Sequence, residues 1–384
     1  MGGGVMGAGA RTRVLVDATA VPADRGGVGR YVDQLLPALQ EVGASLAVVC
    51  QARDLELYGT LLPSADVVAA PPAIESRPAR LAWEQVGLPR VARAVGAQVL
   101  HCPHYTFPLR AGLPVVTTLH DATFFTSPEV HQPVKRTFFR TWTRASLRLA
   151  ARCVVPSRAT LDELARVAGA TRERVDVAHH GVDPVSFHLP SPEEREQARA
   201  TLGLAARRYV AFLGTIEPRK NVPALIAGWQ QACRRVDDPP ALVLAGGRGW
   251  DDRVDPALAA VPDDLEVLAP GYLPLEQLAG LLGGAEVVAY PSLGEGFGLP
   301  VLEAMACGAA VLTSPHLAIP EVGGDAVEYV ESTPGDLADG LVRLLTEPAR
   351  RAELADAAVT RAAEFTWAAS AEAHLRTFAR AAAG

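Results

Sequence analysis

Short runs of apolar, largely β-branched residues alternate along the chain with segments in which apolar residues recur at helical spacing. The short runs predict strands within residues 14–20, 46–50, 97–103, 114–121, 153–157 and 175–183 of the first half, and within 209–215, 241–247, 265–272, 286–292 and 309–315 of the second. Segments such as 29–43, 159–169 and 273–285 predict helices that end near glycine. This alternation predicts an α/β fold with parallel sheets and helices on both faces.

The length of the chain, 384 residues, exceeds one ordinary domain core, so we expect two domains. A stretch at residues 184–208, with three prolines and a predicted charge-rich helix, separates the two groups of strands. We therefore expect an N-terminal domain at 1–187, with 1–11 disordered, a linker at 188–207, a C-terminal domain at 208–365 and a last helix at 366–384 that crosses back to the first domain. Two doubly wound domains would hold ligands in a cleft, at the carboxyl ends of their strands.

Composition and charge exclude several classes of protein. With 49% hydrophobic and 21% charged residues the chain is globular, and its net charge of −7 argues against a general nucleic-acid binder. The cysteines are scattered and form no CxxC motif, which indicates reduced, mostly buried thiols in a cytoplasmic protein rather than disulfides or a metal site: Cys50, Cys102, Cys153, Cys233 and Cys307. No run approaches the roughly 20 apolar residues of a transmembrane span, so we expect a protein that is soluble or at most peripheral to a membrane.

Two glutamates, Glu295 and Glu303, flank a Gly-Phe-Gly turn after the predicted strand at 286–292. One interpretation is structural: Gly296 and Gly298 permit a tight turn, and Glu303 favours the positive start of the next helix, where Pro300 fits the first turn. The other is functional, because such a turn offers backbone N–H groups, a helix dipole and carboxylate acceptors to a hydroxylated, anionic ligand.

A pair of cations follows the first predicted strand of the second half. That strand ends at Gly214 and Thr215, and Arg219 and Lys220 stand at the predicted start of a helix. A helix N-terminus already attracts anions, so the added cations predict a diphosphate site. The alternative is an ordinary surface pair near Glu217.

The combination of GTIEPRKN at 214–221 with EGFGLPVLEAMACGAAV at 295–311 resembles the retaining glycosyltransferases of the GT-B fold, in the large family 4 group. Glu295 and Glu303 match its E-x7-E motif. LHDATFFTSPE at 119–129 and PSRATLDEL at 156–164 are similar to the first domain of its mannosyltransferase-like members, and GVDPVSF at 181–187 to the segment before the linker. The resemblance covers nearly the whole chain. It implies an α/β GT-B architecture, two doubly wound Rossmann-like domains that face each other across a cleft, with the acceptor bound by the first and the nucleotide sugar by the second.

The resemblance also implies roles for single residues. Glu295 would hold the donor sugar's hydroxyls and support the charge at its anomeric carbon, while Glu303 would accept from the ribose hydroxyls. Arg219 and Lys220 would neutralise the departing diphosphate, and His120 would complete the catalytic set by facing the donor sugar. The remaining donor-contacting residues would be Gly214, Thr215, Tyr272, Gly296, Phe297, Gly298 and Leu299.

The reaction implied by the resemblance is transfer of a sugar, with mannose from GDP-mannose as the expected donor, to an acceptor hydroxyl with retention of anomeric configuration. The acceptor would be a glycan, a glycolipid or a small natural product. We expect no divalent metal or other cofactor, because no Asp-x-Asp follows a strand and the cations Arg219 and Lys220 can take the place of a metal at the diphosphate. A nucleotide-sugar epimerase of the same fold, or a catalytically silent sugar-nucleotide-binding protein, are the alternatives.

The first half contains a glycine-rich segment with Gly26, Gly27 and Gly29. It is a weak dinucleotide fingerprint, because Val32 stands where the third glycine belongs and the strand that ends at Cys50 is not followed by an acidic residue. The resemblance favours a flexible loop that contacts the diphosphate and the acceptor.

Several histidines also call for interpretation. His120 is either a hydrogen-bonded residue at a strand end or, as the resemblance implies, a contact to a sugar hydroxyl. His101 and His104 lack further ligands at zinc spacing, so we expect a strand end that lines the acceptor side. His180 stands where the family's NGVD segment usually carries asparagine, a departure that would alter the hinge between the domains.

Arginines recur every four residues in a helical segment and form a predicted basic stripe: Arg136, Arg140, Arg144, Arg148 and Arg152. Phe138, Phe139 and Trp142 lie beside them in the sequence. Such a stripe is either a solvated helix face or a surface that docks onto anionic lipid, which would suit a lipid-linked acceptor at the inner face of a membrane.

Overall fold

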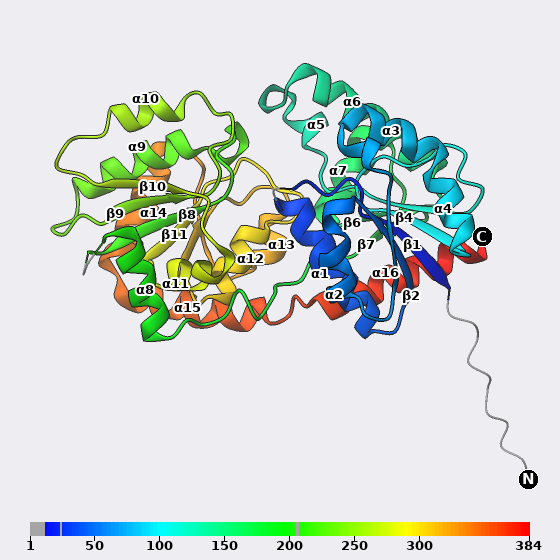
Figure 1. Ribbon diagram of the computed structural model, residues 1–384. Helices are drawn as coiled ribbons and strands as arrows, with labels where there is room; N and C mark the ends of the chain where they lie inside the picture. Colours follow the sequence, from blue (N-terminus) through cyan, green and yellow to red (C-terminus); the bar gives the residue numbers. More distant parts are fainter. Residues whose placement is uncertain (1–11, 24, 205–206) are drawn as a thin grey trace, which may run out of the picture. The chain divides into compact units, whose positions relative to one another are not determined.

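The computed structural model describes residues 12–23, 25–204 and 207–384, and it divides into two compact units (Figure 1). The first unit contains the chain up to Thr126, Gln132–Gly181 and Trp367–Gly384. The second contains Ser127–His131 and Val182–Thr366. The predicted leader at 1–11 lies outside the described residues.

The first unit is built on a parallel sheet whose strands run in the order β3-β2-β1-β4-β5-β6-β7. Its strands are β1 (Arg13–Asp17), β2 (Ser45–Cys50), β3 (Asp66–Ala69), β4 (Val99–Cys102), β5 (Val115–Thr118), β6 (Arg152–Val155) and β7 (Val175–Val177). All strands predicted for this half are present. The edge strand β3 is the addition, and its half-exposed residues explain why no continuous apolar run marks it.

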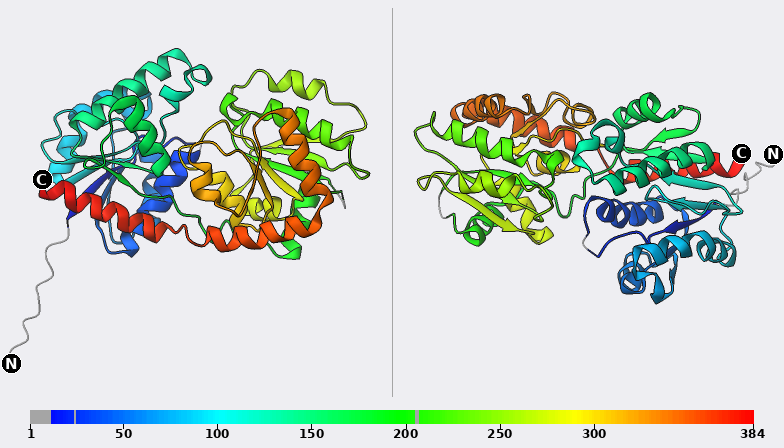
Figure 2. Two further views of the ribbon diagram at one scale, coloured as in Figure 1. Left: turned by 180° about the vertical axis from the view of Figure 1, so that it is seen from behind. Right: turned by 90° about the horizontal axis from the view of Figure 1, so that it is seen from above.

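Helices cover both faces of this sheet (Figures 1 and 2). They are α1 (Gly27–Glu41), η1 (Ala52–Asp54), α2 (Leu55–Leu61), η2 (Pro72–Glu75), α3 (Arg77–Val86), α4 (Leu88–Ala94), α5 (Thr123–Thr126), α6 (Pro133–Leu149), α7 (Arg158–Ala168) and α16 (Trp367–Ala383). The chain's last helix, α16, red in Figure 2, packs against α1 and against the sheet of the first unit. The two ends of the chain therefore share one hydrophobic core, which includes Tyr31, Trp367 and Phe378.

The second unit has a parallel sheet in the order β10-β9-β8-β11-β12-β13. Its strands are β8 (Tyr209–Leu213), β9 (Ala241–Ala245), β10 (Val267–Gly271), β11 (Val287–Tyr290), β12 (Val311–Thr313) and β13 (Glu328–Tyr329). Its helices are α8 (Pro192–Leu202), η4 (Pro218–Lys220), α9 (Val222–Cys233), α10 (Val254–Ala259), η5 (Leu275–Gln277), α11 (Leu278–Gly283), α12 (Leu299–Ala306), α13 (Ile319–Gly323), α14 (Pro334–Thr346) and α15 (Pro348–Ala362); η3 (Pro128–Val130) comes from the inserted segment.

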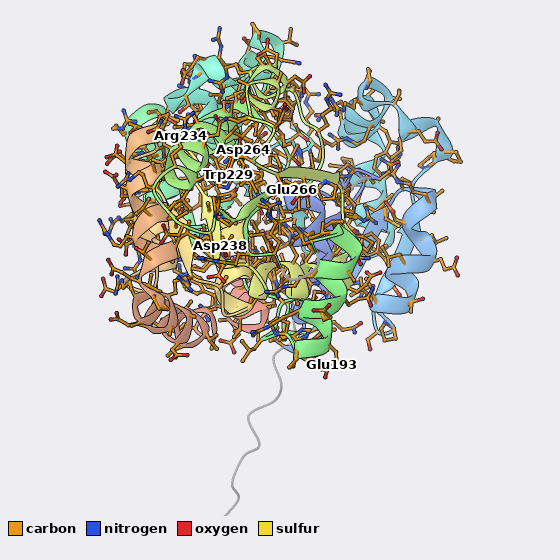
Figure 3. The ribbon with its side chains drawn as sticks, turned by 90° about the vertical axis from the view of Figure 1, so that its left-hand side faces the viewer. Glu193, Trp229, Arg234, Asp238, Asp264 and Glu266 are labelled. Carbon is orange, nitrogen blue, oxygen red and sulfur yellow. The ribbon has the colours of Figure 1, made fainter. Side chains whose placement is uncertain are left out.

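The core of the second unit lies where α9 and α14 pack together against the sheet. Trp229 of α9, labelled in Figure 3, is fully buried there, and its ring nitrogen donates to the Pro240 carbonyl at 3.0 Å. All five cysteines of the chain are free and buried, as the scattered spacing predicts.

The structure differs from the expected boundaries at the start of the second unit. The division falls at Gly181 and Val182, rather than at 187 and 188. Within the expected linker, residues 192–202 form α8, which Ser191 and Glu194 cap reciprocally and which packs against α11. The charge-rich sequence of α8 suggested an exposed connector, but a single buried side, at Ala198, suffices to attach this helix to the unit.

Both sheets reverse their strand order beside the first strand of the unit. In the second unit β8 leads outward through β9 to β10, after which the chain returns to place β11 on the other side of β8. Ligands of doubly wound folds bind at such a switch point, outside the carboxyl ends of the two strands. The loops after β8 and β11 are therefore the first place to look for a site.

Candidate functional site

The loops that follow β8 and β11 are joined to each other by hydrogen bonds. The Leu293 amide donates to the Arg219 carbonyl at 2.8 Å, and the Arg219 guanidinium donates to the Gly294 carbonyl at 2.8 Å. These bonds bring the cation pair and Glu295 together, although they are far apart in the sequence. The predicted convergence of the two motifs within one unit is thus present.

Glycines let the loops after β8 and β9 approach closely. Gly214 and Gly246 both have positive φ, at 154° and 133°, and a Cβ on Gly246 would lie 2.1 Å from the Gly214 carbonyl oxygen. No side chain fits in that space. The chain then forms η4, and Asn221, at φ 57°, precedes α9.

The position of the cation pair differs from the one expected. Arg219 and Lys220 lie in the 3-10 turn η4, before the first residue of α9 at Val222, rather than in the first turn of that helix. The Pro218 carbonyl accepts from the Asn221 amide and closes this turn. The turn directs the Lys220 side chain inward, where only 7% of the residue remains exposed.

Glu295 lies at the centre of a buried ion cluster. Its Oε1 accepts a hydrogen bond from Lys220 Nζ at 2.7 Å, and its Oε2 forms an ion pair with the Arg219 guanidinium. Arg219 also donates to Glu217 Oε1 at 2.5 Å. Two carboxylates thus face two cations, and the charges of the four side chains balance.

Two hydroxyl groups complete the shell around the same carboxylate oxygen. The Tyr290 hydroxyl donates to Glu295 Oε1 at 2.9 Å and Ser292 Oγ at 2.7 Å. Lys220 Nζ also donates to the Tyr290 hydroxyl and lies 4.8 Å from the centre of its ring. Tyr290, at 1% exposure, and Ser292, at 0%, are as inaccessible as core residues.

The cluster controls the protonation of its members. Burial alone would raise the pKa of Glu295, but the charges of Arg219 and Lys220 outweigh burial and hold this pKa well below its usual value. Burial, followed by the charge of Arg219, lowers the pKa of Lys220, and the two glutamates oppose that shift. Burial and the adjacent Glu295 raise the pKa of Tyr290 well above its usual value, so Tyr290 keeps its proton and acts as a donor.

The Gly-Phe-Gly segment forms the predicted turn from strand to helix. Gly298 has φ 104° and immediately precedes α12, and Pro300 lies in the first turn of that helix, as expected. The Phe297 side chain packs edge-on against Phe365 at 5.8 Å between ring centroids and belongs to the core. A contact from Phe297 to a ligand would therefore involve its backbone.

Glu303 does not serve as a helix-start residue. It is the fifth residue of α12, beyond the first turn in which the helix dipole acts, and only 3% of it is exposed. The interpretation of Glu303 as a residue that favours the positive start of the helix is therefore wrong. A carboxylate held inside the unit, one element away from the ion cluster, is suited to accepting hydrogen bonds.

Other expected donor contacts lie at the same edge of the sheet. Thr215 is exposed just after β8, and Tyr272 is 66% exposed immediately after β10. The Gly271 carbonyl accepts from the Gly246 amide at 2.8 Å, which ties the β10 end to the β9 loop. Leu299 is half-buried at the first position of α12.

His120 follows β5 in the first unit. Its Nε2 lies 2.7 Å from the Pro103 carbonyl oxygen, which can only accept, so the ring carries its proton on Nε2 and presents Nδ1 as an acceptor. Burial lowers the pKa of His120, while the bond to Pro103 and the charge of Asp121 oppose that shift. At neutral pH this ring can therefore accept a hydrogen bond from a hydroxyl group.

His120 borders a buried network that links both ends of the chain. The Tyr31 hydroxyl bonds Thr118 Oγ1 at 3.1 Å and His374 Nε2 at 2.8 Å, and His101 Nε2 bonds Thr118 Oγ1 at 3.0 Å. The Tyr31 and His120 rings meet edge to face at 5.1 Å.

The expected place of His101 is thus corrected. His101 is fully buried within β4 and faces Phe378 and His374 of α16, rather than lining a strand end. A helix from the far end of the sequence covers this side chain, and no local pattern could have shown that. His180, the departure from asparagine, stacks on Trp367 at 5.7 Å and is part of the same core.

Tyr105 is held in an unusual backbone conformation beside His120. Its φ is 51°, in the left-handed region that bulky residues rarely adopt. Its hydroxyl accepts from the Asp121 amide at 3.1 Å, and its ring lies 5.8 Å from that of His120. Backbone strain of this kind often marks a functional site, and here it positions the segment that carries His120.

The glycine segment after β1 begins a helix. Gly26 precedes the first residue of α1, and a Cβ at Gly26 or Gly27 would meet no atom within 4 Å. Arg25 fixes the segment through ion pairs with Asp33 at 3.1 Å and Asp54 at 2.7 Å. The first residues of α1 are thus open to a ligand, while the ion pairs of Arg25 hold the start of this helix in place.

The predicted basic stripe is shorter than the spacing suggested. Its first four arginines lie on α6, but Arg152 is the first residue of β6 and pairs with Asp176 at 2.6 Å. Arg140 donates to the Phe124 carbonyl at 2.6 Å, and Arg144 stacks over Phe125.

The aromatic residues of α6 face inward: Phe139 stacks on Phe124 at 4.4 Å, and Trp142 meets Phe107 at 5.7 Å. They pack within the unit rather than beside the arginines on its surface, where Arg144 and Arg148 are exposed.

Comparisons with known families cover most of the chain. Residues 25–186 match the family described as Glycosyltransferase Family 4, and residues 194–361 match the one described as Glycosyl transferases group 1. The first match lies mainly in the first unit and the second lies within the second unit, and together they include the glycine segment, His120 and the ion cluster. The chain belongs to glycosyltransferase family 4.

Relatives of this chain carry related names. It is 34% identical over 230 residues to O-antigen chain mannosyltransferase B of Escherichia coli, covering 59% of this chain and 60% of the relative. It is 35% identical over 249 residues to a D-inositol 3-phosphate glycosyltransferase of Mycolicibacterium vanbaalenii, covering 60% and 53%. The chain thus spans little more than half the length of these relatives.

Among solved structures, HepE of Anabaena in complex with UDP and glucose is similar over 96% of this chain and 100% of its own, with a TM-score of 0.75 and 18% identity. This likeness shows the GT-B fold, as the sequence predicts.

Sequence reasoning missed the residues that surround the expected catalytic ones. Tyr290 and Ser292 were included in a predicted strand, but no role was given to their hydroxyls. Their positions relative to Glu295, five and three residues earlier at a strand end, were the available signal. Tyr31 and His374 are 343 residues apart, and nothing local connects them.

Proposed function

We propose that this protein is a retaining glycosyltransferase that moves a sugar from a nucleotide-sugar donor to an acceptor hydroxyl without a divalent metal. The observation that carries the proposal is the buried pair Arg219 and Lys220 beside Glu295, at the switch point of the second sheet. Charge develops on the leaving diphosphate in such a reaction, and fixed cations in a site shielded from water stabilise it strongly.

Glu295 would act on the sugar side of the same site. Its carboxylate is ionised and buried, which suits hydrogen bonds to the donor's hydroxyls and support of positive charge at the anomeric carbon. His120, through Nδ1, would accept from a sugar hydroxyl. With these roles assigned, the leaving phosphate takes the proton of the acceptor on the face from which it departs, and the product retains the donor's configuration.

The expected donor is GDP-mannose. The support for mannose is the similarity to a protein named O-antigen chain mannosyltransferase B, and the support for a nucleoside diphosphate is the similarity to a structure that holds UDP and glucose. Tyr272, exposed after β10, has the flat face on which a base can stack.

The decisive experiment is incubation of the protein with a panel of nucleotide sugars after treatment with EDTA. We expect transfer, or slow hydrolysis, of one donor, and anomeric NMR couplings that show an α-linked product. An epimerised sugar would favour the epimerase, and binding alone the catalytically silent protein. Activity that collapses with EDTA and returns with Mg²⁺ or Mn²⁺ would overturn the metal-free site.

Glu303→Ala is expected to weaken binding of free nucleoside diphosphate by about one to two orders of magnitude. The variant removes a charged acceptor for ribose hydroxyls, and hydrogen bonds to charged groups contribute roughly 1.5–3 kcal/mol. Isothermal titration of the variant measures the change. Glu276→Ala, an exposed change in η5, is the control and should bind normally. An unchanged dissociation constant in Glu303→Ala would remove Glu303 from the nucleotide site.

The acceptor-side proposal concerns membranes. No helix in the described part of the chain is long and apolar enough to cross a bilayer. Arg144 and Arg148 of α6 are exposed, and such cations attract anionic lipid by about 1 kcal/mol each near its surface. We propose that they dock the protein peripherally, with a lipid-linked acceptor at the cytoplasmic face.

Arg144→Glu combined with Arg148→Glu should abolish binding to phosphatidylglycerol vesicles at low salt, while thermal unfolding stays unchanged. Arg140 is left intact because its bond to Phe124 supports the fold. The control is the same charge change at the exposed Arg234 and Arg235 at the end of α9, where Figure 3 labels Arg234. If the wild-type protein does not bind such vesicles at low salt, a water-soluble acceptor becomes the favoured substrate.

A further inference from the structure

The donors to Glu295 are of two kinds. Lys220 and Arg219 are cations, and Tyr290 and Ser292 are neutral hydroxyls at the end of β11 and just after it. Three of these donors, all but Arg219, converge on the single oxygen Oε1. The two kinds respond differently to an anionic ligand, and that difference assigns a role to the hydroxyls.

Once a diphosphate binds, Arg219 and Lys220 are shared between the diphosphate and Glu295. In the structure the charges of Arg219 and Lys220 are balanced by Glu295 and Glu217. A diphosphate brings further negative charge to the same two cations, so their hold on Glu295 weakens. A buried carboxylate that loses its cationic partners takes up a proton or moves, because burial disfavours its charged form.

The hydrogen bonds from Tyr290 and Ser292 to Glu295 do not depend on whether a diphosphate binds the cations. Lys220 can only donate to the Tyr290 oxygen, so the single Tyr290 proton points to Glu295. Ser292 Oγ lies 2.7 Å from Glu295 Oε1 but 3.3 Å and 3.4 Å from the Arg219 and Gly294 carbonyls, so its proton also favours the carboxylate.

The sheet fixes both hydroxyls. The Tyr290 ring stacks on Phe212 at 5.9 Å, and the Tyr290 carbonyl accepts from Thr313 at 2.8 Å. The Ser292 carbonyl accepts from Ser314. Neither side chain can follow a departing cation, so both stay with Glu295 when a ligand enters.

We infer that Tyr290 and Ser292 are positioning residues that keep Glu295 ionised and in place while Arg219 and Lys220 hold the leaving diphosphate. The inference rests on the proposed function and adds to it the separation of two tasks, binding of the diphosphate by the cations and retention of Glu295 by the hydroxyls.

The test is Tyr290→Phe, which removes one hydroxyl and keeps the ring. Tyr209→Phe is the matched control, because Tyr209 is a fully buried tyrosine of the neighbouring strand β8 whose hydroxyl donates to the Leu281 carbonyl instead. We expect kcat of Tyr290→Phe to fall by about ten- to a hundredfold, while the dissociation constant for free nucleoside diphosphate changes less than about twofold. Tyr209→Phe should leave both unchanged.

The pH profile supplies a readout that a purely structural role would not move. Loss of a donor to the carboxylate raises the pKa of Glu295, so the acidic limb of the kcat profile should shift to higher pH in Tyr290→Phe and in Ser292→Ala. Ser292→Ala also covers the case in which Tyr290→Phe folds poorly.

Three results would overturn the inference. The first is normal kcat in both Tyr290→Phe and Ser292→Ala, and the second is a parallel loss of kcat and nucleotide affinity, which would make the hydroxyls part of the diphosphate site. The third is wild-type protein that transfers no sugar from any donor, which would overturn the proposed function as well.

Discussion

Lys220→Ala and Arg219→Ala are each expected to lower turnover by about one to three orders of magnitude, which is the loss measured when one charge-stabilising donor is removed from an active site. Both cations lie at the switch point, and both are largely shielded from water by the loops after β8 and β11. The ratio of kcat/KM between wild type and variant gives the lost stabilisation of the transition state directly.

The same variants disturb the fold to a measurable extent. Without Lys220 or Arg219, Glu295 keeps one cation and two hydroxyls, so we expect a lower Tm but a folded protein. Arg235→Ala, which removes an exposed cation at the end of α9, is the control for charge alone. Near-normal rates in both Lys220→Ala and Arg219→Ala would place the diphosphate elsewhere.

The sequence predicts the sheets because their strands are buried on both sides. The strands β8, β9 and β11 are continuous apolar runs, which is the pattern of parallel strands between two layers of helices. The strands β3 and β13 were missed because β3 is half-exposed at an edge and β13 is only two residues long. The charge-rich helix expected in the linker is present as α8, but its attachment to the second unit was missed because one buried alanine carries almost no pattern.

The residues of the candidate site likewise divide into those that the sequence predicts and those that it does not. Glu295, Arg219 and Lys220 could be found because motifs and strand ends mark them, and the topology of the sheet brings them together. The 3-10 turn at 218–220 and the inward direction of Lys220 could not be predicted, because they depend on hydrogen bonds between loops that are 75 residues apart. Tyr290 and Ser292, by contrast, lie only five and three residues before Glu295 in the sequence.

The first unit holds buried histidines whose burial was invisible in the sequence. His101 and His374 are fully buried, and His180 is 5% exposed. His374 donates from Nδ1 to the Ser370 carbonyl at 2.8 Å, so its Nε2 accepts from Tyr31 and the ring is neutral. Burial lowers the pKa of His374 to about 4. Burial, with the charges of neighbouring histidines as the second cause, lowers the pKa values of His101 and His180 well below 6.5.

These shifts set the sign of a dependence of stability on pH. In the unfolded chain each histidine takes up a proton as the pH falls through about 6.5, while in the folded unit it stays neutral to a lower pH. The unfolded state therefore binds more protons in the window from about 6.5 down to about 4, and the free energy of unfolding decreases as the pH falls through it. Burial also lowers the pKa of His104, to about 3, and the pKa of His120. Each of these five histidines contributes up to about 1.4 kcal/mol per pH unit, so together they reach up to about 7 kcal/mol per unit.

We therefore expect the first unit to unfold steeply between pH 6 and pH 5, at roughly the window that these pKa shifts define. Hydrogen exchange should show loss of protection in β4 and α16, which carry His101 and His374, while β8 and β9 of the second unit stay protected. In that unit the lowered pKa of Glu295 retains its contribution until far more acidic pH.

His374→Gln supplies the variant that separates this cause from general acid denaturation. It removes one of the five titrating groups, so the slope of unfolding free energy against pH should fall by about a fifth, even though the variant is less stable at pH 7.5. The control His188→Gln changes a half-buried histidine in the second unit and should leave the slope as it is. Equal loss of protection in both units, or a slope that His374→Gln does not change, would show that the buried histidines do not control the acid stability of the first unit.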